Sequence, residues 1–387
     1  MAGRSKTGGA RAAAGAFVIP VGTAICECLL EVAQPVELGC KHLAVGRDAL
    51  GGSGLNYALR LLAAGGDVFP ILTVGDDDRG RRVQEALLKA ATAGRASAPV
   101  MAFLRSRDFL APNIRTLRSV ILLDGAARTI FSYDCEGHHA FLAHVERQWD
   151  RLAPAIRGRR GALIIGHIYG DRPHRHTIPA GACTRFLVDR FGGAGPVLIN
   201  FGNSQLALGI DFWMPLLRSC DIIQANTQEI GGFFAASGRT DEPLRMLHFL
   251  RDQPFSTVLT LGGQGALLID RTDRRRILHL PAWSVKTVDP TGAGDACAAG
   301  LAVGLRGRKS YTSCQIQRAL AQGALWSAYA CTSVGGAGSC PNARTLSRFR
   351  SRLAASQVNT FRALSVEAAA ALLGADAHAR RHPAVQD

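Results

Sequence analysis

Short apolar runs alternate with amphipathic stretches along most of the chain. Each run is continuously apolar and ends at Gly, Asn or a polar turn, which is typical of strands buried on both faces of a parallel sheet with crossover helices. Strands of this kind are predicted at residues 16–22, 68–75, 162–168, 196–202, 221–226 and 256–263. The pattern therefore predicts an α/β fold with a mainly parallel central sheet.

The polar and apolar positions between these strands predict helices. In residues 54–66 the apolar side chains recur at i, i+3, i+4 and i+7, which makes one buried stripe. The stripe consists of Leu55, Ala58, Leu59 and Leu62. A second helical stretch covers residues 78–90, directly after the strand at 68–75. We expect both helices to pack on the sheet.

Two segments depart from this alternation. Residues 24–49 and 115–133 read as extended pieces, and the second contains a tight turn at Asp124-Gly125. Extended segments inserted in an α/β frame predict a small separate sheet. The ends of the chain differ again, because they are rich in Ala and Arg. We expect a flexible tail at 1–15, one domain at 16–345, and a helical or frayed extension at 346–387.

Composition limits the class of protein. The chain has 387 residues, of which 47% are hydrophobic, so it can bury a substantial core. No apolar run reaches the roughly 20 residues that a membrane helix needs. The first sixteen residues lack the apolar region of a secretory signal. The ten Cys form no C-x-x-C pair, which argues against a disulfide framework or zinc ribbon. These features predict a cytoplasmic protein.

The formal net charge of +15 raises the question of an anionic partner. The excess is diffuse, and only five of the 45 basic residues are Lys, so a general Arg bias explains it as well as a nucleic-acid site does. A positive field also suits an enzyme that handles small phosphorylated substrates. We therefore expect no nucleic-acid partner despite the basic charge.

Two common phosphate-binding motifs are excluded. None of the five Lys follows a Gly, so there is no Walker A loop, and no G-x-G continues to G-x-G-x-x-G. The string "DPTGAGD" at 289–295 remains, followed by a helical stretch of small residues. Consecutive N–H groups at such a helix start can form an anion site, with Asp295 beside it as a base. Alternatively, Asp295 only complements the helix dipole.

Three further motifs precede this loop. "GGSGLNYALRLLAAGGDVFPILTVGDDDRG" spans 51–80, "NTQE" spans 226–229 and "TLGGQG" spans 260–265. Together with 289–295, and in this order, they resemble the ribokinase-like, PfkB-type carbohydrate kinases over roughly residues 16–345. The resemblance implies a three-layer fold, with a mainly parallel sheet between helices and a small β-sheet lid built from about 24–49 and 115–133.

The resemblance also implies roles in phosphoryl transfer. Asp295 matches the base that deprotonates the acceptor hydroxyl, and Gly292, Ala293 and Gly294 match the anion hole. Nucleotide contacts are implied for Thr260, Gly262 and Gly265, although this stretch alone reads equally as a β-turn. Asn226 and Glu229 match the motif that orients Mg²⁺-bound phosphate through water, while Glu229 also suits an ordinary first helical turn. Asp289 is implied in binding K⁺.

Residues of the acceptor side are matched as well. Gly51, Gly52 and Asn56 resemble the loop that holds acceptor hydroxyls, and Glu27 stands where relatives usually have Asp. The chain departs from the family pattern at Asn200, where Asp is frequent, and in the stretches 134–139 and 335–341. All of these departures concern the choice of substrate. Asp76, Asp77 and Gly80 suit a turn whose role is structural.

The implied activity is transfer of the γ-phosphate of ATP to a hydroxyl of a sugar, with Mg²⁺ and K⁺ as cofactors. A nucleoside acceptor is an alternative, and so is a sugar phosphate bound by Arg115, Arg118 and Arg128. A silent nucleic-acid-binding or regulatory protein on a kinase fold is the alternative from another class. No membrane partner is expected, whereas a homodimer through the lid is consistent with the resemblance.

Overall fold

A central β-sheet organises the part of the chain that the computed structural model describes, residues 15–33, 35–37, 39–124, 127–133, 140–171, 179–273, 276–338, 340–355, 357 and 359–381. Within these residues the sheet has ten strands, in the order β14-β13-β12-β11-β10-β9-β8-β1-β4, with β5 beside β1. They are β1 (Phe17–Thr23), β4 (Asp67–Val68), β5 (Ile71–Thr73), β8 (Gly161–Ile165), β9 (Val197–Ile199), β10 (Ile222–Asn226), β11 (Ser256–Thr260), β12 (Ala266–Ile269), β13 (Ile277–Leu280) and β14 (Arg362–Leu364). The turn expected at Gly125 and the stretch 134–139 lie outside the described residues.

Most of this sheet is parallel. Every pairing from β4 and β5 through to β11 is parallel, whereas β12, β13 and β14 add an antiparallel edge. The strands predicted from apolar runs coincide with β1, the β4–β5 pair, β8, β9, β10 and β11. The predicted α/β fold with a mainly parallel sheet is therefore confirmed.

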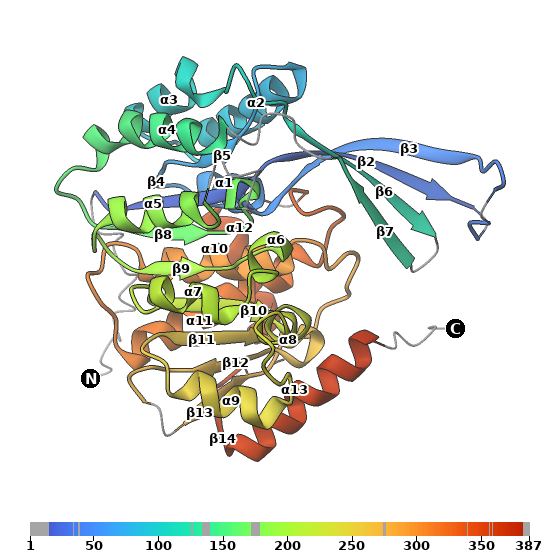
Figure 1. Ribbon diagram of the computed structural model, residues 1–387, viewed down its shortest axis with the longest axis vertical. Coiled ribbons are helices and arrows are strands. Elements are labelled where there is room, and N and C mark those ends of the chain that lie inside the picture. The colour runs from blue at the N-terminus through green and yellow to red at the C-terminus, as the bar shows by residue number, and fades with distance from the viewer. Residues whose placement is uncertain are drawn as a thin grey trace, which may run out of the picture.

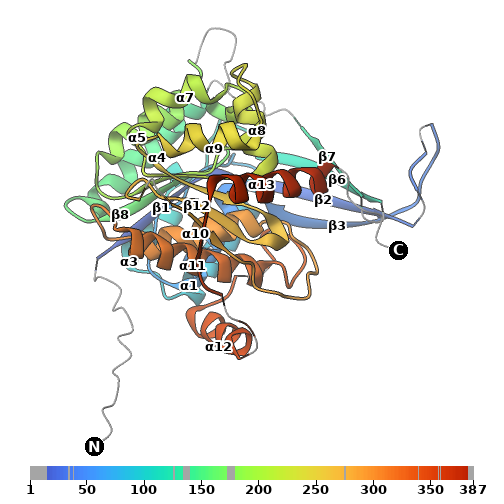
Figure 2. The same ribbon diagram turned by 90° about the horizontal axis from the view of Figure 1, so that it is seen from below.

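Helices cover both faces of the sheet. They are α1 (Ser53–Ala64), α2 (Asp78–Ala93), α3 (Ala98–Leu104), α4 (Phe141–Ile156), α5 (Ala182–Phe191), α6 (Asn203–Leu206), α7 (Ile210–Leu217), α8 (Thr227–Ala235), α9 (Pro243–Arg251), α10 (Ala293–Leu305), α11 (Ser313–Ala330), α12 (Ala343–Ala354) and α13 (Val366–Arg381). Figure 2 shows α4, α5, α7, α8 and α9 on one side of the sheet, and α1, α10 and α11 on the other. The three-layer arrangement expected from the resemblance is thus present.

A smaller sheet projects from the main body (Figure 1). Its four strands are β2 (Ile25–Val32), β3 (Ala44–Gly51), β6 (Leu117–Asp124) and β7 (Ala127–Ser132), in the order β3-β2-β6-β7. They come from the two segments that broke the alternating pattern, so the predicted lid sheet is confirmed. We call this sheet the lid.

Asp77 links the start of α2 in the main body to the segment that enters the lid. Its carboxylate accepts hydrogen bonds from the Gly80 N–H at 2.8 Å, which caps α2, and from the Thr116 N–H at 2.9 Å, just before β6. A Cβ atom at Gly80 would lie 1.9 Å from the Gly75 carbonyl oxygen, so a side chain does not fit there. Asp77 and Gly80 therefore have the structural role that the sequence suggested.

The C-terminal residues contribute to the main body. The expected boundary at residue 345 falls inside α12, β14 pairs with β13 at the edge of the sheet, and α13 buries Ala369 and Leu373. Composition gave little sign of this, because the buried stripe of α13 is short and rich in Ala. Of the described helices, none is long and apolar enough to cross a membrane.

Candidate active site

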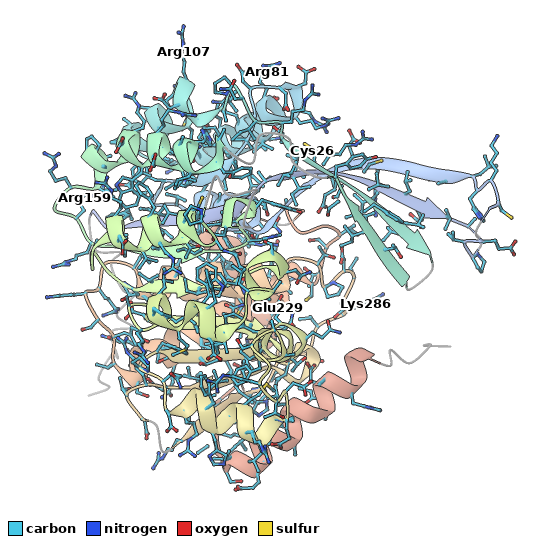
Figure 3. The ribbon with its side chains drawn as sticks, viewed as in Figure 1. Cys26, Arg81, Arg107, Arg159, Glu229 and Lys286 are labelled. Carbon is cyan, nitrogen blue, oxygen red and sulfur yellow. The ribbon has the colours of Figure 1, made fainter. Side chains whose placement is uncertain are left out.

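The candidate site lies where the carboxyl ends of β9, β10 and β11 face the start of α10, the usual ligand position in open α/β sheets. A cavity of about 210 Å³ opens there. Its lining consists of Asn200, Gln224, Ala225, Asn226, Glu229, Thr260, Gly292, Gly294 and Asp295. Six of these residues were predicted from the sequence for phosphoryl transfer or nucleotide binding. Figure 3 labels Glu229, which belongs to the first turn of α8.

The predicted anion hole forms the start of α10. Gly292 caps the helix in the left-handed region, at φ 74°, and its backbone lies against Gly336. A Cβ atom at Gly294 would meet nothing within 4 Å, so this position faces open space. The first N–H groups of a helix have no acceptor within it, and the helix dipole makes them attractive to an anion. The Ala293 N–H, however, donates to the Pro290 carbonyl at 3.1 Å and closes the turn.

Asp295 is held from α1. The Asn56 amide donates a hydrogen bond from Nδ2 to Asp295 Oδ2 at 2.7 Å. Burial raises the pKa of Asp295, while the Asn56 hydrogen bond, the Arg60 guanidinium and the Tyr57 hydroxyl lower it. The three groups therefore favour the ionised carboxylate, which is the form that can accept a proton.

Asn200 and Gln224 connect this centre to the sheet. The Tyr57 hydroxyl donates to Asn200 Oδ1 at 2.7 Å, and Asn200 Nδ2 donates to the Gln224 carbonyl at 3.0 Å. The Gln224 side chain then donates to the Gly294 carbonyl at 2.9 Å. Asn200, at a position where the resembling family often has Asp, thus links α1 to β10. Sequence reasoning missed Gln224 and Tyr57, although Gln224 stood out as a polar residue in an apolar strand.

The N-T-Q-E motif forms a reciprocal cap at the start of α8. Asn226 Oδ1 accepts from the Glu229 N–H at 2.9 Å, and Glu229 Oε2 accepts from the Asn226 N–H at 2.8 Å. The helix-start interpretation of Glu229 therefore describes its local geometry. Both residues also line the cavity beside Asp295, as well as a neighbouring cavity of about 320 Å³. The two interpretations are compatible, because the cap fixes both side chains at the cavity wall.

A larger cavity of about 640 Å³ extends from the same point. Thr260, Gly262 and Gly265 line it, as the resemblance predicted for the nucleotide, together with Trp283 and Val285. At Gly265 the φ angle is 102° and a Cβ atom would lie 2.0 Å from the Leu280 carbonyl oxygen, so glycine is needed for the turn between β11 and β12. Trp283 was not predicted, because no motif contains it.

The predicted acceptor residues meet where the lid joins α1. A Cβ atom at Gly51 would lie 2.5 Å from Glu27 Oε1, so the carboxylate of Glu27 rests against this glycine. Gly52 has φ 94° and has no space for a side chain beside the Thr23 carbonyl. Asn56 is 4% exposed, and its Oδ1 has no hydrogen-bond donor among the described residues. The hydrogen bond from Asn56 to Asp295 joins these acceptor-side residues to the cavity that Asp295 lines.

The cations considered for an acceptor phosphate lie elsewhere. Arg118 pairs with Cys26 across the lid, next to the Ser119–Glu27 pair, so Arg118 and Glu27 point to opposite faces. The Arg118 guanidinium lies over the Tyr133 ring at 5.1 Å from the ring centre. Arg115 lines a cavity together with Asp76, Asp77 and Asp78. The side chain of Arg128 lies outside the described residues.

Asp289 ties the loop before α10 to the 335–341 segment. Its carboxylate accepts from the Thr291 N–H at 2.9 Å and from the Gly335 N–H at 2.8 Å. No cluster of three or more His, Cys, Asp or Glu able to hold a metal occurs in the described part of the chain.

Comparisons with known proteins agree with this geometry. The family model described as pfkB family carbohydrate kinase matches residues 211–343. The fold resembles ribokinase from Thermotoga maritima, with a TM-score of 0.63 and 19% identity, over 87% of this chain and 99% of that one. No curated protein matches the chain in sequence.

Two further solved structures carry ligands. A nucleoside kinase from Burkholderia thailandensis in complex with inosine has a TM-score of 0.61 and 16% identity, over 87% of this chain and 96% of that one. Aminoimidazole riboside kinase from Salmonella enterica, in complex with aminoimidazole riboside and an ATP analogue, has a TM-score of 0.60 and 22% identity. The match covers 86% of this chain and 99% of that one. The resemblance to the ribokinase-like PfkB kinases is thereby confirmed.

Proposed function

From a ribokinase-like fold and a match to the PfkB carbohydrate kinases, we propose that this protein transfers the γ-phosphate of ATP to a hydroxyl group of a sugar. The observation that carries the proposal is the 2.7 Å hydrogen bond between Asn56 and Asp295. It joins the loop matched to acceptor binding with the carboxylate beside the helix N-terminus matched to phosphate binding. Acceptor, base and anion site thus lie within one continuous group of contacts.

In the proposed reaction the acceptor oxygen attacks the γ-phosphorus and forms a new P–O bond, while the bond from the γ-phosphorus to the bridging oxygen of ADP breaks. Asp295 accepts the hydroxyl proton as the attack proceeds. The free N–H groups at the start of α10 stabilise charge on the transferred phosphoryl oxygens. Gly294 suits this role because it carries no side chain that would project into the open space beside the backbone. Gly292 suits it because its φ of 74° turns the chain into the helix.

For ATP we propose the larger cavity, with Thr260, Gly262 and Gly265 along the nucleotide and Trp283 in the wall. Its continuation into the smaller cavity would bring the terminal phosphates to Asn226, Glu229 and the start of α10. Mg²⁺ bound to those phosphates would neutralise part of their charge. Asn226 and Glu229 would orient that complex through water.

A neutral polyol acceptor agrees best with the groups near Asn56. Its Oδ1 can accept from a hydroxyl, and the Glu27 carboxylate can accept from a second one. The opposite orientation of Arg118 and the acids around Arg115 argue against a sugar phosphate. A nucleoside stays as the alternative, because structural neighbours bind inosine and aminoimidazole riboside. Each of these acceptors would offer a hydroxyl group to Asp295.

Two properties extend the proposal. We propose that K⁺ binds near Asp289 and stabilises the loop before α10, which Asp289 already organises through Thr291 and Gly335. We also propose a homodimer through the lid, since its surface carries exposed apolar side chains. These are Leu43, Val45, Ile130, Phe131 and Tyr133.

The test is a coupled ADP-release screen over free sugars, nucleosides and sugar phosphates, with Mg²⁺ and with K⁺ or Na⁺. Turnover with one free sugar supports the proposal, and turnover only with a nucleoside selects the alternative acceptor. No turnover with any acceptor would contradict the assignment as a kinase. A salt-dependent shift of DNA or RNA at physiological ionic strength would instead favour the nucleic-acid-binding alternative.

A further inference from the structure

The C-terminal helix α13 reaches the helix that carries the N-T-Q-E motif. It runs from β14 at the edge of the sheet to α8 (Figure 1), and it packs on both α8 and α9. Its inward stripe consists of Ala369, Leu373 and Asp376, at i, i+4 and i+7. Asp376 is only 6% exposed. The helix therefore buries one carboxylate toward α8 in a stripe that is otherwise apolar.

The buried carboxylate contacts the first residue of α8. Thr227 Oγ1 donates a hydrogen bond to Asp376 Oδ2 at 2.5 Å, and Thr227 is 4% exposed. A hydrogen bond to a carboxylate is stronger than one between neutral groups, and a buried partner left behind by its removal is costly. The contact joins positions 149 residues apart, so it fixes the start of α8 against the end of the fold.

Thr227 lies between Asn226 and Glu229, which line the cavity that contains Asp295. Asn226 precedes it as the cap of α8, and Glu229 follows two residues later and completes the reciprocal cap. Both of these side chains line the cavity that contains Asp295, whereas the Thr227 hydroxyl is directed to α13. The start of α8 is therefore held by Asp376 of α13, while Asn226 and Glu229 line the cavity.

We propose that Asp376 is a positioning residue for the triphosphate, which makes the C-terminal helix a working part of the nucleotide site. By holding Thr227, it would fix the Asn226–Glu229 cap at the wall of the cavity proposed for the outer phosphates and their Mg²⁺. The inference rests on the proposed use of ATP. It assigns a role in nucleotide binding to Asp376, which lies outside all four sequence motifs.

The experiment measures binding to the full-length chain by calorimetry. The probes are Mg²⁺ with a non-hydrolysable ATP analogue, and AMP, which shares the base and α-phosphate but lacks the outer phosphates. In Asp376→Ala and Thr227→Val we expect the analogue to bind about tenfold more weakly, from the loss of one buried charge-assisted hydrogen bond, with AMP affinity unchanged. Thr227→Ser keeps the hydroxyl and should bind both probes like the wild type.

A matched control separates positioning from general stability. The Tyr311 hydroxyl donates to the Asp221 carbonyl at 2.8 Å and lies 3.1 Å from Ser256 Oγ, at the amino end of β11 and away from the cavity. Tyr311→Phe should lower the thermal unfolding temperature and leave both affinities unchanged. In the double variant Thr227→Val/Asp376→Ala the two losses should be less than additive, because both substitutions remove the same hydrogen bond.

Three results would overturn the inference. If the wild type binds the analogue and the two variants bind it equally well, Asp376 has no positioning role, although the kinase proposal stands. If analogue and AMP weaken together, Asp376 supports the fold in general. If the wild type binds no analogue, the proposed function fails, and the positioning role fails with it. Should Asp376→Ala not fold, Thr227→Val and Thr227→Ser decide the question.

Discussion

Removal of the Asn56 amide should impair proton transfer to Asp295 without removing the base. Asn56 Nδ2 lies 2.7 Å from Asp295 Oδ2 and the residue is 4% exposed, so little water can replace the lost donor. A hydrogen bond to a charged group contributes about 1.5–3 kcal/mol. Because this hydrogen bond also orients the carboxylate for proton transfer, its loss in Asn56→Ala is expected to lower kcat/KM by about 10- to 100-fold.

The pH dependence of the same variant gives a sharper test. Burial raises the pKa of Asp295, and the Asn56 hydrogen bond opposes that shift together with Arg60 and Tyr57. Losing this donor raises the pKa of Asp295 further. Catalysis requires the ionised carboxylate. As the pH is lowered, the activity of Asn56→Ala should therefore fall at a higher pH than the activity of the wild type.

The assay is coupled ADP release at saturating ATP, with the acceptor found in the screen, across the acidic and neutral range. A matched control is Gln317→Ala, because Gln317 bonds only Ser313 within α11 among the described contacts. A lowered kcat/KM with an unmoved acidic limb would mean that Asn56 orients the acceptor and does not tune the base. An unchanged kcat/KM would refute the coupling between Asn56 and Asp295.

Three other outcomes are expected. In Gly294→Val the new side chain would project into open space, so ATP binding should weaken while the thermal stability stays unchanged. Gly292 has φ 74°, so Gly292→Ala should lower the free energy of unfolding by about 1–2 kcal/mol in denaturant titrations. Burial raises the pKa of Asp171 from 3.8 to about 6, so the protonated form stabilises the fold below the unfolded pKa. This stabilisation, on the order of 3 kcal/mol, is lost as the pH rises through 6, and Asp171→Asn should remove that pH dependence from chemical unfolding curves. Val45 and Ile130 are 73% and 53% exposed and lie on one face of the lid. The double variant Val45→Asp/Ile130→Asp should therefore sediment as a monomer where the wild type sediments as a dimer. A wild type that sediments as a monomer would contradict the proposed dimer.

The main architecture could be predicted because it depends on local patterns. Continuous apolar runs marked the parallel strands, and the two segments without that pattern became the lid. The antiparallel edge was missed because β12 and β13 follow β11 without the α-helical stretches that separate the parallel strands. The place of α13 was missed because its packing on α8 and α9 uses few large apolar residues.

The candidate site was predictable only where motifs carry the information. Three of the four motifs supply Asn226, Glu229, Thr260 and Asp295, which line one cavity. The contacts that hold them join residues far apart in the chain, such as Asn56 with Asp295, and no local pattern reports them. The Ala293 N–H was expected in the anion hole but closes a turn with Pro290, a backbone detail that follows only from the folded loop.

The central claim is that Asp295 removes the acceptor proton, and Asp295→Asn tests it most directly. The variant keeps the shape of the side chain but cannot act as a base at neutral pH. With the acceptor identified, ADP release should fall by about 10²- to 10⁴-fold, while the ATP analogue still binds and the chain stays folded. Turnover close to that of the wild type would contradict the claim.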